Sequence, residues 1–328
     1  MLLAVAAQAQ LLWKVSGNGL ARPSYIMGTY HFAPASVMDE IPGMQQALDG
    51  CDMVVGEIEK DDVMTPDFQM AMMQAMAAPP DSTLDKLYTP EEYAIIENVF
   101  NKYMADMGVT LSMMNGLKPM GISMQLQAAQ ALKESKEDEP HGITSFIDMA
   151  VQMRANDMGR PSAGLEGVDE QIDLLFNTPL HDQARSLLET CKNDDLFEEM
   201  TDYIIEAYMK QDLDAIGEIF ADPEVGGYDS ESLELLIYKR NRNWAEKLVT
   251  MMPERACLVC VGAGHLPGDQ GLLQLLRGGG ETPGREQALL EAMKPYLSEK
   301  RRGKLDRALR LARMAKLAGL ALGEGRHG

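Results

Sequence analysis

The sequence predicts an α+β fold: a small mixed β-sheet built from the N- and C-terminal segments of the chain, with a large helical insertion between them. Two observations carry this prediction. A short apolar run that ends in G-x-x-H occurs at Ser24–His31 and again, more than two hundred residues later, at Ala256–His265. Between them, from about residue 61 to residue 252, apolar residues recur at the three- and four-residue spacing of helices. A chain that repeats this unusual strand ending is expected to bring its two endings together.

The N-terminal part is expected to begin with a hairpin. Leu11–Val15 and Ser24–Tyr30 are apolar segments, and the loop between them contains Gly17-Asn18-Gly19. A short helix at Ile41–Leu48 then separates the second strand from a third at Cys51–Ile58. Strand, helix and strand in this order predict a right-handed crossover between parallel, neighbouring strands. The side chains that follow these strands are therefore expected at the same edge of the sheet.

The insertion is expected to be a series of helices separated by proline or glycine. The expected helices are Asp67–Ala77, Thr89–Met107, Ser112–Leu132, Thr144–Asn156, Asp169–Phe176, His181–Cys191, Leu196–Met209, Leu213–Phe220 and Ser230–Met251. Thr89, followed by Pro90 and two glutamates, has the chemistry that favours a helix start. A short strand that carries Glu166 is expected at Pro161–Val168. A further helix is expected to open at Pro267, directly after the second G-x-x-H strand.

The amino-acid composition indicates which classes of molecule the protein binds. The chain has 328 residues, with 50 acidic against 30 basic side chains and a formal charge of -20. Such a surface argues against nucleic acid and anionic membranes and favours cationic ligands or metal ions. The 25 methionines, against seven phenylalanines, serve either as gap-fillers in the core or as an adaptable binding groove. The four cysteines predict no disulfide scaffold, since Cys257 and Cys260 lie three apart on a strand and face opposite sides.

Both ends of the chain differ from its body. The opening residues, MLLAVAAQAQ, resemble the end of a secretory signal peptide, which predicts a leader at residues 1–9 and a periplasmic or secreted protein. The apolar part is short and follows no basic segment, so a chance apolar end is the alternative. No other segment approaches the ~20 apolar residues that span a bilayer. Residues 285–328 carry eleven Lys and Arg against five Asp and Glu, which predicts a basic helical tail.

Two histidines and a glutamate form the candidate site. The glycines of the two motifs, Gly28 and Gly262, lack a Cβ and so let the chain turn tightly or approach a ligand closely. His31 and His265 follow them at the strand ends, and Glu57 ends the third strand. Two imidazoles and a carboxylate suit zinc, manganese, cobalt or iron. Three protein ligands leave a position open for water, which is typical of hydrolytic metal sites.

Several motifs together resemble those of the TraB/GumN/Tiki superfamily, over roughly Leu11 to Leu276. They are GTYH, E-x-E after a Val-Val pair, GLE, RN-x-x-W and VGAGHLPG. The resemblance implies an α+β fold related to erythromycin-esterase and ChaN-like proteins, in a domain at residues 10–284. For the Tiki members it implies a divalent-metal-dependent peptidase that removes N-terminal residues from secreted signals. After Leu276 the sequence departs from the family, because GGGETPG leads into the basic tail rather than into an aromatic-containing strand.

The resemblance also assigns roles to individual residues. It makes the two motif histidines metal ligands and matches Glu57, the first acid of E-x-E, to the family's glutamate. Glu59 is the alternative, since two residues apart on a strand share a face. Glu166 or Glu57 would take up a proton during the reaction. Arg240 would clamp a substrate carboxylate or an oxyanion, or would form only a salt bridge on its helix.

The function predicted from the sequence is metal-dependent hydrolysis of a peptide or a small amide or ester, outside the cytoplasm. A metal-bound water would attack the carbonyl, so no serine or cysteine nucleophile is needed, and the sequence contains no G-x-S-x-G. The alternative is a non-catalytic extracytoplasmic binding protein for a peptide, haem or a metal, which needs the groove but no open, water-bearing metal position.

Overall fold

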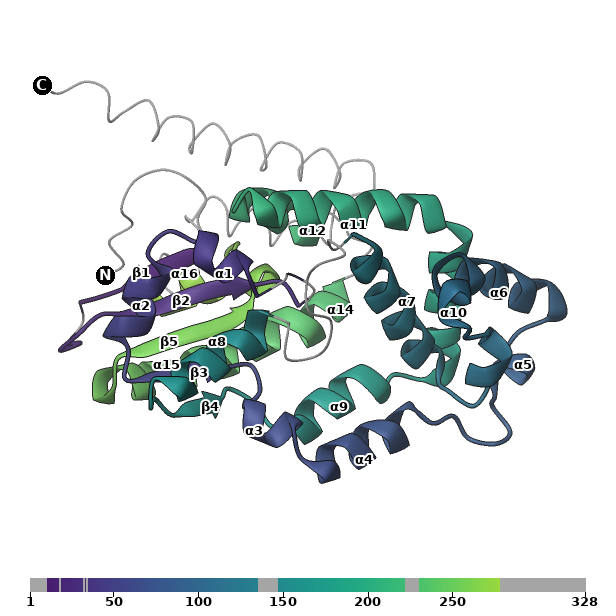
Figure 1. Ribbon diagram of the computed structural model, residues 1–328, viewed down its shortest axis with the longest axis horizontal. Helices are drawn as coiled ribbons and strands as arrows, with labels where there is room; N and C mark the ends of the chain where they lie inside the picture. The colour runs from purple at the N-terminus through teal and green to yellow at the C-terminus, as the bar shows by residue number, and fades with distance from the viewer. Residues whose placement is uncertain are drawn as a thin grey trace, which may run out of the picture. The chain divides into compact units, whose positions relative to one another are not determined.

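The computed structural model describes residues 11–17, 19–31, 33, 35–134, 147–221 and 230–277 (Figure 1). All of them belong to the first of two compact units, which comprises residues 1–278. The leader expected at residues 1–9 and the basic tail expected at residues 285–328 lie outside the described residues. Among the helices that are described, none is both long and apolar enough to cross a membrane.

The sheet has five strands in the order β1-β2-β5-β3-β4. The strands are β1 (Leu12–Val15), β2 (Ser24–Thr29), β3 (Met53–Gly56), β4 (Ser162–Gly164) and β5 (Cys257–Gly262). β1 and β2 form the antiparallel hairpin that the sequence predicts, and the other pairings are all parallel. The sheet is therefore small and mixed, and both ends of the described chain contribute to it, as expected.

One expectation about strand order is wrong. β2 and β3 are parallel, but they are not neighbours, because β5 lies between them. In its register, Ile26 and Val54 flank the central strand, pairing with Val259 and Leu258 respectively. The first five residues of β5 are buried, and such a continuous apolar strand is best accommodated at the centre of a sheet covered on both faces. The crossover through α1 (Val37–Glu40) and α2 (Met44–Gly50) thus skips one position.

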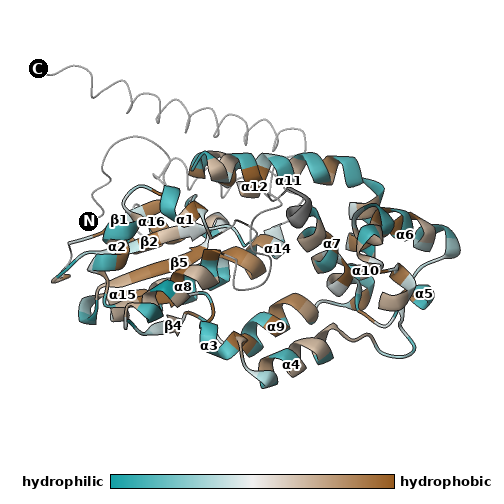
Figure 2. Cartoon of the chain, in the orientation of Figure 1, coloured by the Kyte–Doolittle hydropathy of each residue, from teal (hydrophilic) through white to brown (hydrophobic). Residues whose placement is uncertain are grey.

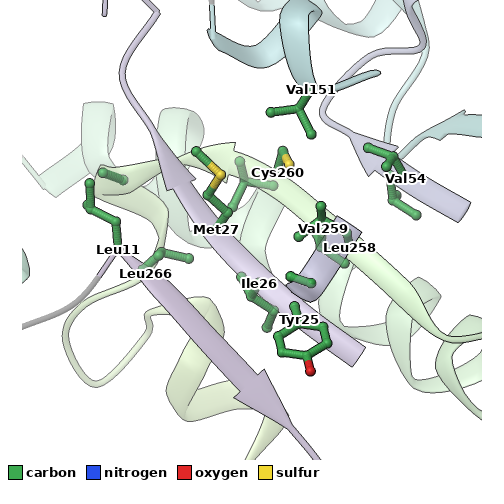
Figure 3. Packing of buried hydrophobic residues seen from close by; sticks show 14 of the residues in the cluster. Leu11, Tyr25, Ile26, Met27, Val54, Val151, Leu258, Val259, Cys260 and Leu266 are labelled. Atoms are coloured by element: carbon green, nitrogen blue, oxygen red, sulfur yellow. The ribbon is translucent and has the colours of Figure 1, made fainter. Parts of the chain in front are cut away.

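Apolar side chains of the central strands form the main core (Figure 3). Ile26 and Met27 of β2 pack with Leu258 and Val259 of β5, and all four are fully buried. Helix α8 covers β3 and β5, and α15 adds three further buried side chains, Trp244, Leu248 and Met252. The four cysteines are free and buried, in agreement with the expectation that they form no disulfide scaffold.

The insertion carries most of the helices. They are α3 (Lys60–Val63), α4 (Pro66–Met76), α5 (Leu84–Leu87), α6 (Pro90–Met104), α7 (Pro119–Glu134), α8 (Ile147–Asp157), α9 (Val168–Phe176), α10 (Leu180–Lys192), α11 (Asp194–Met209), α12 (Leu213–Ala221), α14 (Ser230–Leu233) and α15 (Lys239–Glu254). Helix α6 begins with a capping box, in which the side chains and backbone N–H groups of Thr89 and Glu92 bond reciprocally. Helices α5, α6, α7 and α10 enclose a second apolar core around Phe100 and Ile122. Figure 2 shows β5 as hydrophobic, whereas much of α11 has the colour of hydrophilic residues.

Several elements differ from the sequence predictions. The helix expected from Ser112 begins at Pro119, because residues 111–114 form a 3₁₀ turn and proline favours the first helical position. β4 ends at Gly164, so Glu166 follows the strand instead of lying on it. The long helix expected from Ser230 contains a π-helical segment, η4 (Glu234–Tyr238). The helix expected at Pro267 is α16 (Leu272–Leu276), since a turn with Gly268 at φ +85° delays its start.

Candidate active site

The carboxyl edge of the sheet brings together the residues singled out from the sequence. Glu57 directly follows β3, His31 lies two residues beyond β2, and His265 ends a short 3₁₀ turn, η5 (Ala263–His265), beyond β5. These three side chains, together with Arg240 of α15, line one cavity of about 320 Å³. The parallel arrangement of the three strands is what places their ends at a common edge.

Arg240 is the centre of the hydrogen-bond network at this edge. Its Nη2 lies 2.6 Å from Oε2 of Glu57 and 2.5 Å from Oε1 of Glu166, while its Nε lies 3.0 Å from Oε2 of Glu166. The guanidinium carbon stacks 4.6 Å from the ring centroid of Trp244, a cation–π arrangement. The side chain is only 14% exposed, so one buried cation serves two buried carboxylates.

Helix geometry explains how Arg240 reaches this position. It lies at the start of α15, directly after the π-helical segment η4, and its Nη1 donates to the carbonyl of Leu236 inside that segment at 3.1 Å. Single π turns inside helices occur often at functional sites, because the extra residue changes the face on which the following side chains lie.

Glu57 is held from both sides. The backbone N–H of Gly262 donates to its Oε1 at 2.7 Å, and Gln171 adds a longer contact to Oε2 at 3.4 Å. Burial by itself raises the pKa of Glu57, but the positive fields of His265 (protonated at the acidic pH where Glu57 titrates), Arg240 and His31 outweigh it and lower the pKa to about 2. The carboxylate is therefore ionised at neutral pH.

His265 is oriented by Asn241. Its Nδ1 lies 2.7 Å from Oδ1 of Asn241, whose Nδ2 donates to the backbone carbonyls of His265 and Gln270. The amide is thus turned so that its oxygen accepts a hydrogen bond from Nδ1–H, which leaves Nε2 as the acceptor atom of the ring. Burial, supported by the charge of Arg240, lowers the pKa of His265 to about 4. The imidazole is neutral at pH 7.

His31 has a partner that the sequence did not reveal. Its Nδ1 lies 2.7 Å from Oδ2 of Asp148, in the first turn of α8. The negative charge of Asp148 raises the pKa of His31 to about 9. Both histidines of the site therefore use Nδ1 for an outer acceptor, although the side chain of His31 is 62% exposed and that of His265 is buried. Nε2 of His265 accepts from Nη1 of Arg240 at 3.2 Å.

Glu59, the alternative carboxylate, lies away from the network. The hydroxyl of Ser162 donates to its Oε1 at 2.5 Å, and its backbone is the N-cap of α3. Strand β3 ends at Gly56, so the two-residue alternation on which the choice between Glu57 and Glu59 depended does not extend to them. Of these two glutamates, Glu57 is the one at the site.

Glu166 is engaged along its whole carboxylate. Both oxygens accept from Arg240, and Oε2 also accepts from Nε1 of Trp244 at 3.2 Å. Trp244 in turn lies against His265, with 4.4 Å between the ring centroids. The RN-x-x-W motif thus contributes three residues, Arg240, Asn241 and Trp244, of which the sequence analysis gave a role only to the arginine.

The nitrogen and oxygen atoms of His31, Glu57 and His265 are of the kinds that bind a divalent ion. The ligand atom of His31 lies further from at least one of the other two than they lie from each other. Nε2 of His265 and Oε1 of Glu57 lie 4.0 Å apart, too far for a hydrogen bond but close enough for one ion to contact both. The ligand atoms of His31, Glu57 and His265 do not all lie within 4.8 Å of one another. An outer acceptor on Nδ1, as at both histidines, is typical of imidazoles that bind metal through Nε2.

A separate cluster of carboxylates on α11 is compact enough to bind a metal ion, but a lysine already pairs with it. Within the described ranges, Asp194, Asp195 and Glu198 of α11 are the one group of three or more potential ligands whose atoms all lie within 4.8 Å. Nζ of Lys102 binds Asp194 and Glu198 at 2.7 and 2.8 Å. The lysine accounts for this acidic cluster without an ion.

Comparison with known proteins gives a family match over the same part of the chain. The model of the TraB/PrgY/gumN family matches residues 11–285. Proteins called "Uncharacterized protein YbaP" from Shigella flexneri and from Escherichia coli (strain K12) are each 27% identical over 262 residues, which is 78% of this chain and 88% of theirs. No solved structure matches the chain.

Proposed function

This chain belongs to the TraB/PrgY/gumN family, and we propose that it is a divalent-metal-dependent hydrolase acting on a peptide or a small amide or ester. One observation carries the proposal: Oε1 of Glu57 and Nε2 of His265 face each other across 4.0 Å at the edge of a cavity. The neutral imidazole and ionised carboxylate are the protonation states that a metal requires. His31 is the proposed third ligand, through Nε2.

The metal is proposed to be manganese, cobalt or zinc, since imidazole and carboxylate ligands suit all three. When bound, the ion activates a water molecule for attack and polarises the substrate carbonyl. Because the pKa of His31 is about 9, binding through its Nε2 requires the loss of a proton near neutral pH. Affinity for the metal is therefore expected to rise with pH.

Side chains of the protein are proposed to carry out proton transfer and to stabilise the oxyanion. Glu57 takes up the proton of the attacking water and passes it to the leaving amine. Nη1 of Arg240 lies 3.2 Å from Nε2 of His265, and we assign to Arg240 the stabilisation of the oxyanion. Removal of one oxyanion donor typically lowers kcat by about 10²–10³.

Glu166 receives a positioning role in place of the proton transfer considered from the sequence. Its two oxygens accept three hydrogen bonds, two from Arg240 and one from Trp244. Glu57 accepts one hydrogen bond from Arg240 whereas Glu166 accepts two, so a proton on Glu166 would disturb the guanidinium more. We therefore infer that Glu166 holds Arg240 in place and leaves proton transfer to Glu57.

The place of action and the wider fold relationship belong to the same proposal. We infer from MLLAVAAQAQ that the protein acts in the periplasm or is secreted. N-terminal sequencing of natively expressed protein is expected to begin at Gln10, and an intact Met1 in cytosolic material would contradict export. We also infer that the mixed sheet is related to those of erythromycin-esterase and ChaN-like proteins.

The experiment that tests the function combines metal content with cleavage. Wild type, His31→Ala, His265→Ala and the control His181→Ala are loaded with Mn²⁺, Co²⁺ or Zn²⁺ and assayed on a peptide library, with and without chelator. His181 is 85% exposed on α10, outside the cavity, and its variant should behave as wild type. We expect the two site variants to lose metal and cleavage.

Two outcomes would change the conclusion. If His31→Ala and His265→Ala keep full metal content and full activity, the two G-x-x-H strand ends are structural turns and the proposal fails. If wild type binds both metal and peptide without cleaving, the protein captures its ligand, as a binding protein for a peptide, haem or a metal would.

A further inference from the structure

A second cavity of about 620 Å³ lies in the helical insertion and adjoins the first. The two cavities share four lining residues, two from α7 and two from α11: Gln127, Gln130, Phe197 and Met200. A small amide or ester is accommodated by the 320 Å³ cavity alone, since ligand pockets commonly measure about 300–1,000 Å³. The second cavity adds room for a longer chain.

Buried polar atoms without partners mark this path. Gln130 is 2% exposed, and its Nε2 has no hydrogen-bond partner within the described part of the chain. The same holds for Oγ1 of Thr29, which lines the first cavity, and for Oγ1 of Thr178, which lines the second. Buried polar atoms are nearly always hydrogen-bonded to protein or ordered water, so three along one path mark positions at which a ligand can supply the missing partners.

The lining of the second cavity between these polar atoms is largely apolar and includes flexible side chains. Met124, Met200 and Leu236 line the second cavity, and methionine side chains adjust readily to different shapes. The charged residues of its wall are already paired: Arg185 with Asp182 at 2.7 Å, and Asp194 with Lys102 at 2.7 Å. An uncharged ligand is therefore favoured over a charged one.

We propose that the two cavities form one cleft for an extended peptide with apolar side chains, in which Gln130 donates a hydrogen bond from Nε2 to a backbone carbonyl of the substrate. The inference rests on the proposed hydrolase function and selects a peptide over a small amide or ester. The last torsion of a glutamine side chain is soft, so the buried amide can turn towards a ligand in either cavity. Thr29 and Thr178 offer hydroxyl groups to the same chain on either side.

The test compares Gln130→Met with Gln125→Met. Both residues lie on α7, but Gln125 is half-buried and lines neither cavity. Methionine keeps the unbranched shape and removes the donor. Binding is measured on metal-free protein by fluorescence anisotropy, with a labelled hexapeptide of Leu, Val, Ala and Phe. Hydrolysis of that peptide and of an N-acetyl-leucine anilide is measured on metal-loaded protein.

We expect Gln130→Met to weaken hexapeptide binding about five- to tenfold, the effect of one hydrogen bond, while Gln125→Met binds as wild type. kcat/KM should fall by the same factor for the hexapeptide and by a smaller factor for the anilide, which occupies only the first cavity. Thr178→Val, which removes only a hydroxyl, should also weaken the hexapeptide and gives an independent measurement if Gln130→Met does not fold.

The outcomes separate this inference from the hydrolase proposal. Equal hexapeptide affinity in wild type, Gln130→Met and Thr178→Val would overturn the cleft, as would equal losses for hexapeptide and anilide. Wild type that binds the hexapeptide through Gln130 but never cleaves it would overturn the hydrolase and leave the cleft standing.

Discussion

Replacing Arg240 with methionine should destabilise the protein strongly, because the guanidinium separates two buried carboxylates. The side chains of Glu57 and Glu166 are 10% and 8% exposed, and each lies within 2.6 Å of Nη2 of Arg240. Methionine keeps an apolar stem beside Trp244 but removes the charge and every donor. Two neighbouring anions would then remain in a site that excludes most of the water.

The expected loss in the free energy of unfolding follows from the buried ion pairs that Arg240 forms. Removal of one partner from a buried ion pair costs about 3–5 kcal/mol, because the remaining charge is left buried without a counter-ion. Small domains are stable by about 5–15 kcal/mol in total, so this is a large share. For a domain of this size the melting temperature should fall by roughly 6–20 °C.

The loss should depend on pH in a definite direction. In wild type the pKa of Glu57 is about 2, below its ordinary 4.5, so its ionised form contributes stability above pH 4.5, and the contribution disappears as the pH falls towards 2. Without Arg240 much of that contribution is absent at every pH. The difference between wild type and Arg240→Met should therefore be largest above pH 5 and shrink in acid.

Urea unfolding at several pH values measures both effects. Arg242→Met is the matched control, because Arg242 lies two residues along the same helix and its pair with Glu234 is 44% and 51% exposed. Surface pairs contribute about 0–1 kcal/mol, so the control should change little. Glu166→Gln should cost less in the Arg240→Met background than in wild type. Equal losses from both arginine variants, or strict additivity, would refute the reasoning.

Three further predictions concern single residues of the site. Asp148→Asn should lower the pKa of His31 from about 9 towards its ordinary 6.5, seen by NMR titration of the ring, because the charge that raises it is gone; a pKa still near 9 would assign the shift to another group. Glu57→Gln should abolish metal binding and cleavage while Glu59→Gln leaves both intact, and the reverse result would move the site to Glu59. Gly28→Ala should lower stability by about 1–3 kcal/mol, because the added Cβ would lie 3.1 Å from the backbone of η5; calorimetry with an unchanged melting temperature would contradict this.

The sequence was most informative where a signal is local. An apolar run, a glycine and a histidine within eight residues were enough to predict that His31 and His265 lie at the same edge of the sheet, where both line one cavity. The parallel crossover then placed Glu57 at the same edge. Each of these signals depends on residues next to one another in the chain, which is why they could be recognised without a structure.

What could not be predicted depends on residues far apart. The place of β5 between β2 and β3 is decided by packing on both faces of the sheet, which no local pattern records. Asp148 reaches His31 from a helix 117 residues further along, and an acid in the first turn of a helix is too common to be a signal. The delayed start of α16 depends on Gly268 adopting a positive φ, a conformation glycine permits but does not require.

Because β5 occupies the centre of the sheet, the strands cannot all pair until residue 262 has left the ribosome. Tyr25 pairs with Leu258, and contacts so distant in the chain form slowly, since a long loop must close before they stabilise anything. Until then β2 and β3 each keep an open edge, which can pair with other chains. A chain interrupted within α15 would carry His31 and Glu57 on an unfinished sheet, exposed to aggregation and proteolysis, with His265 never made.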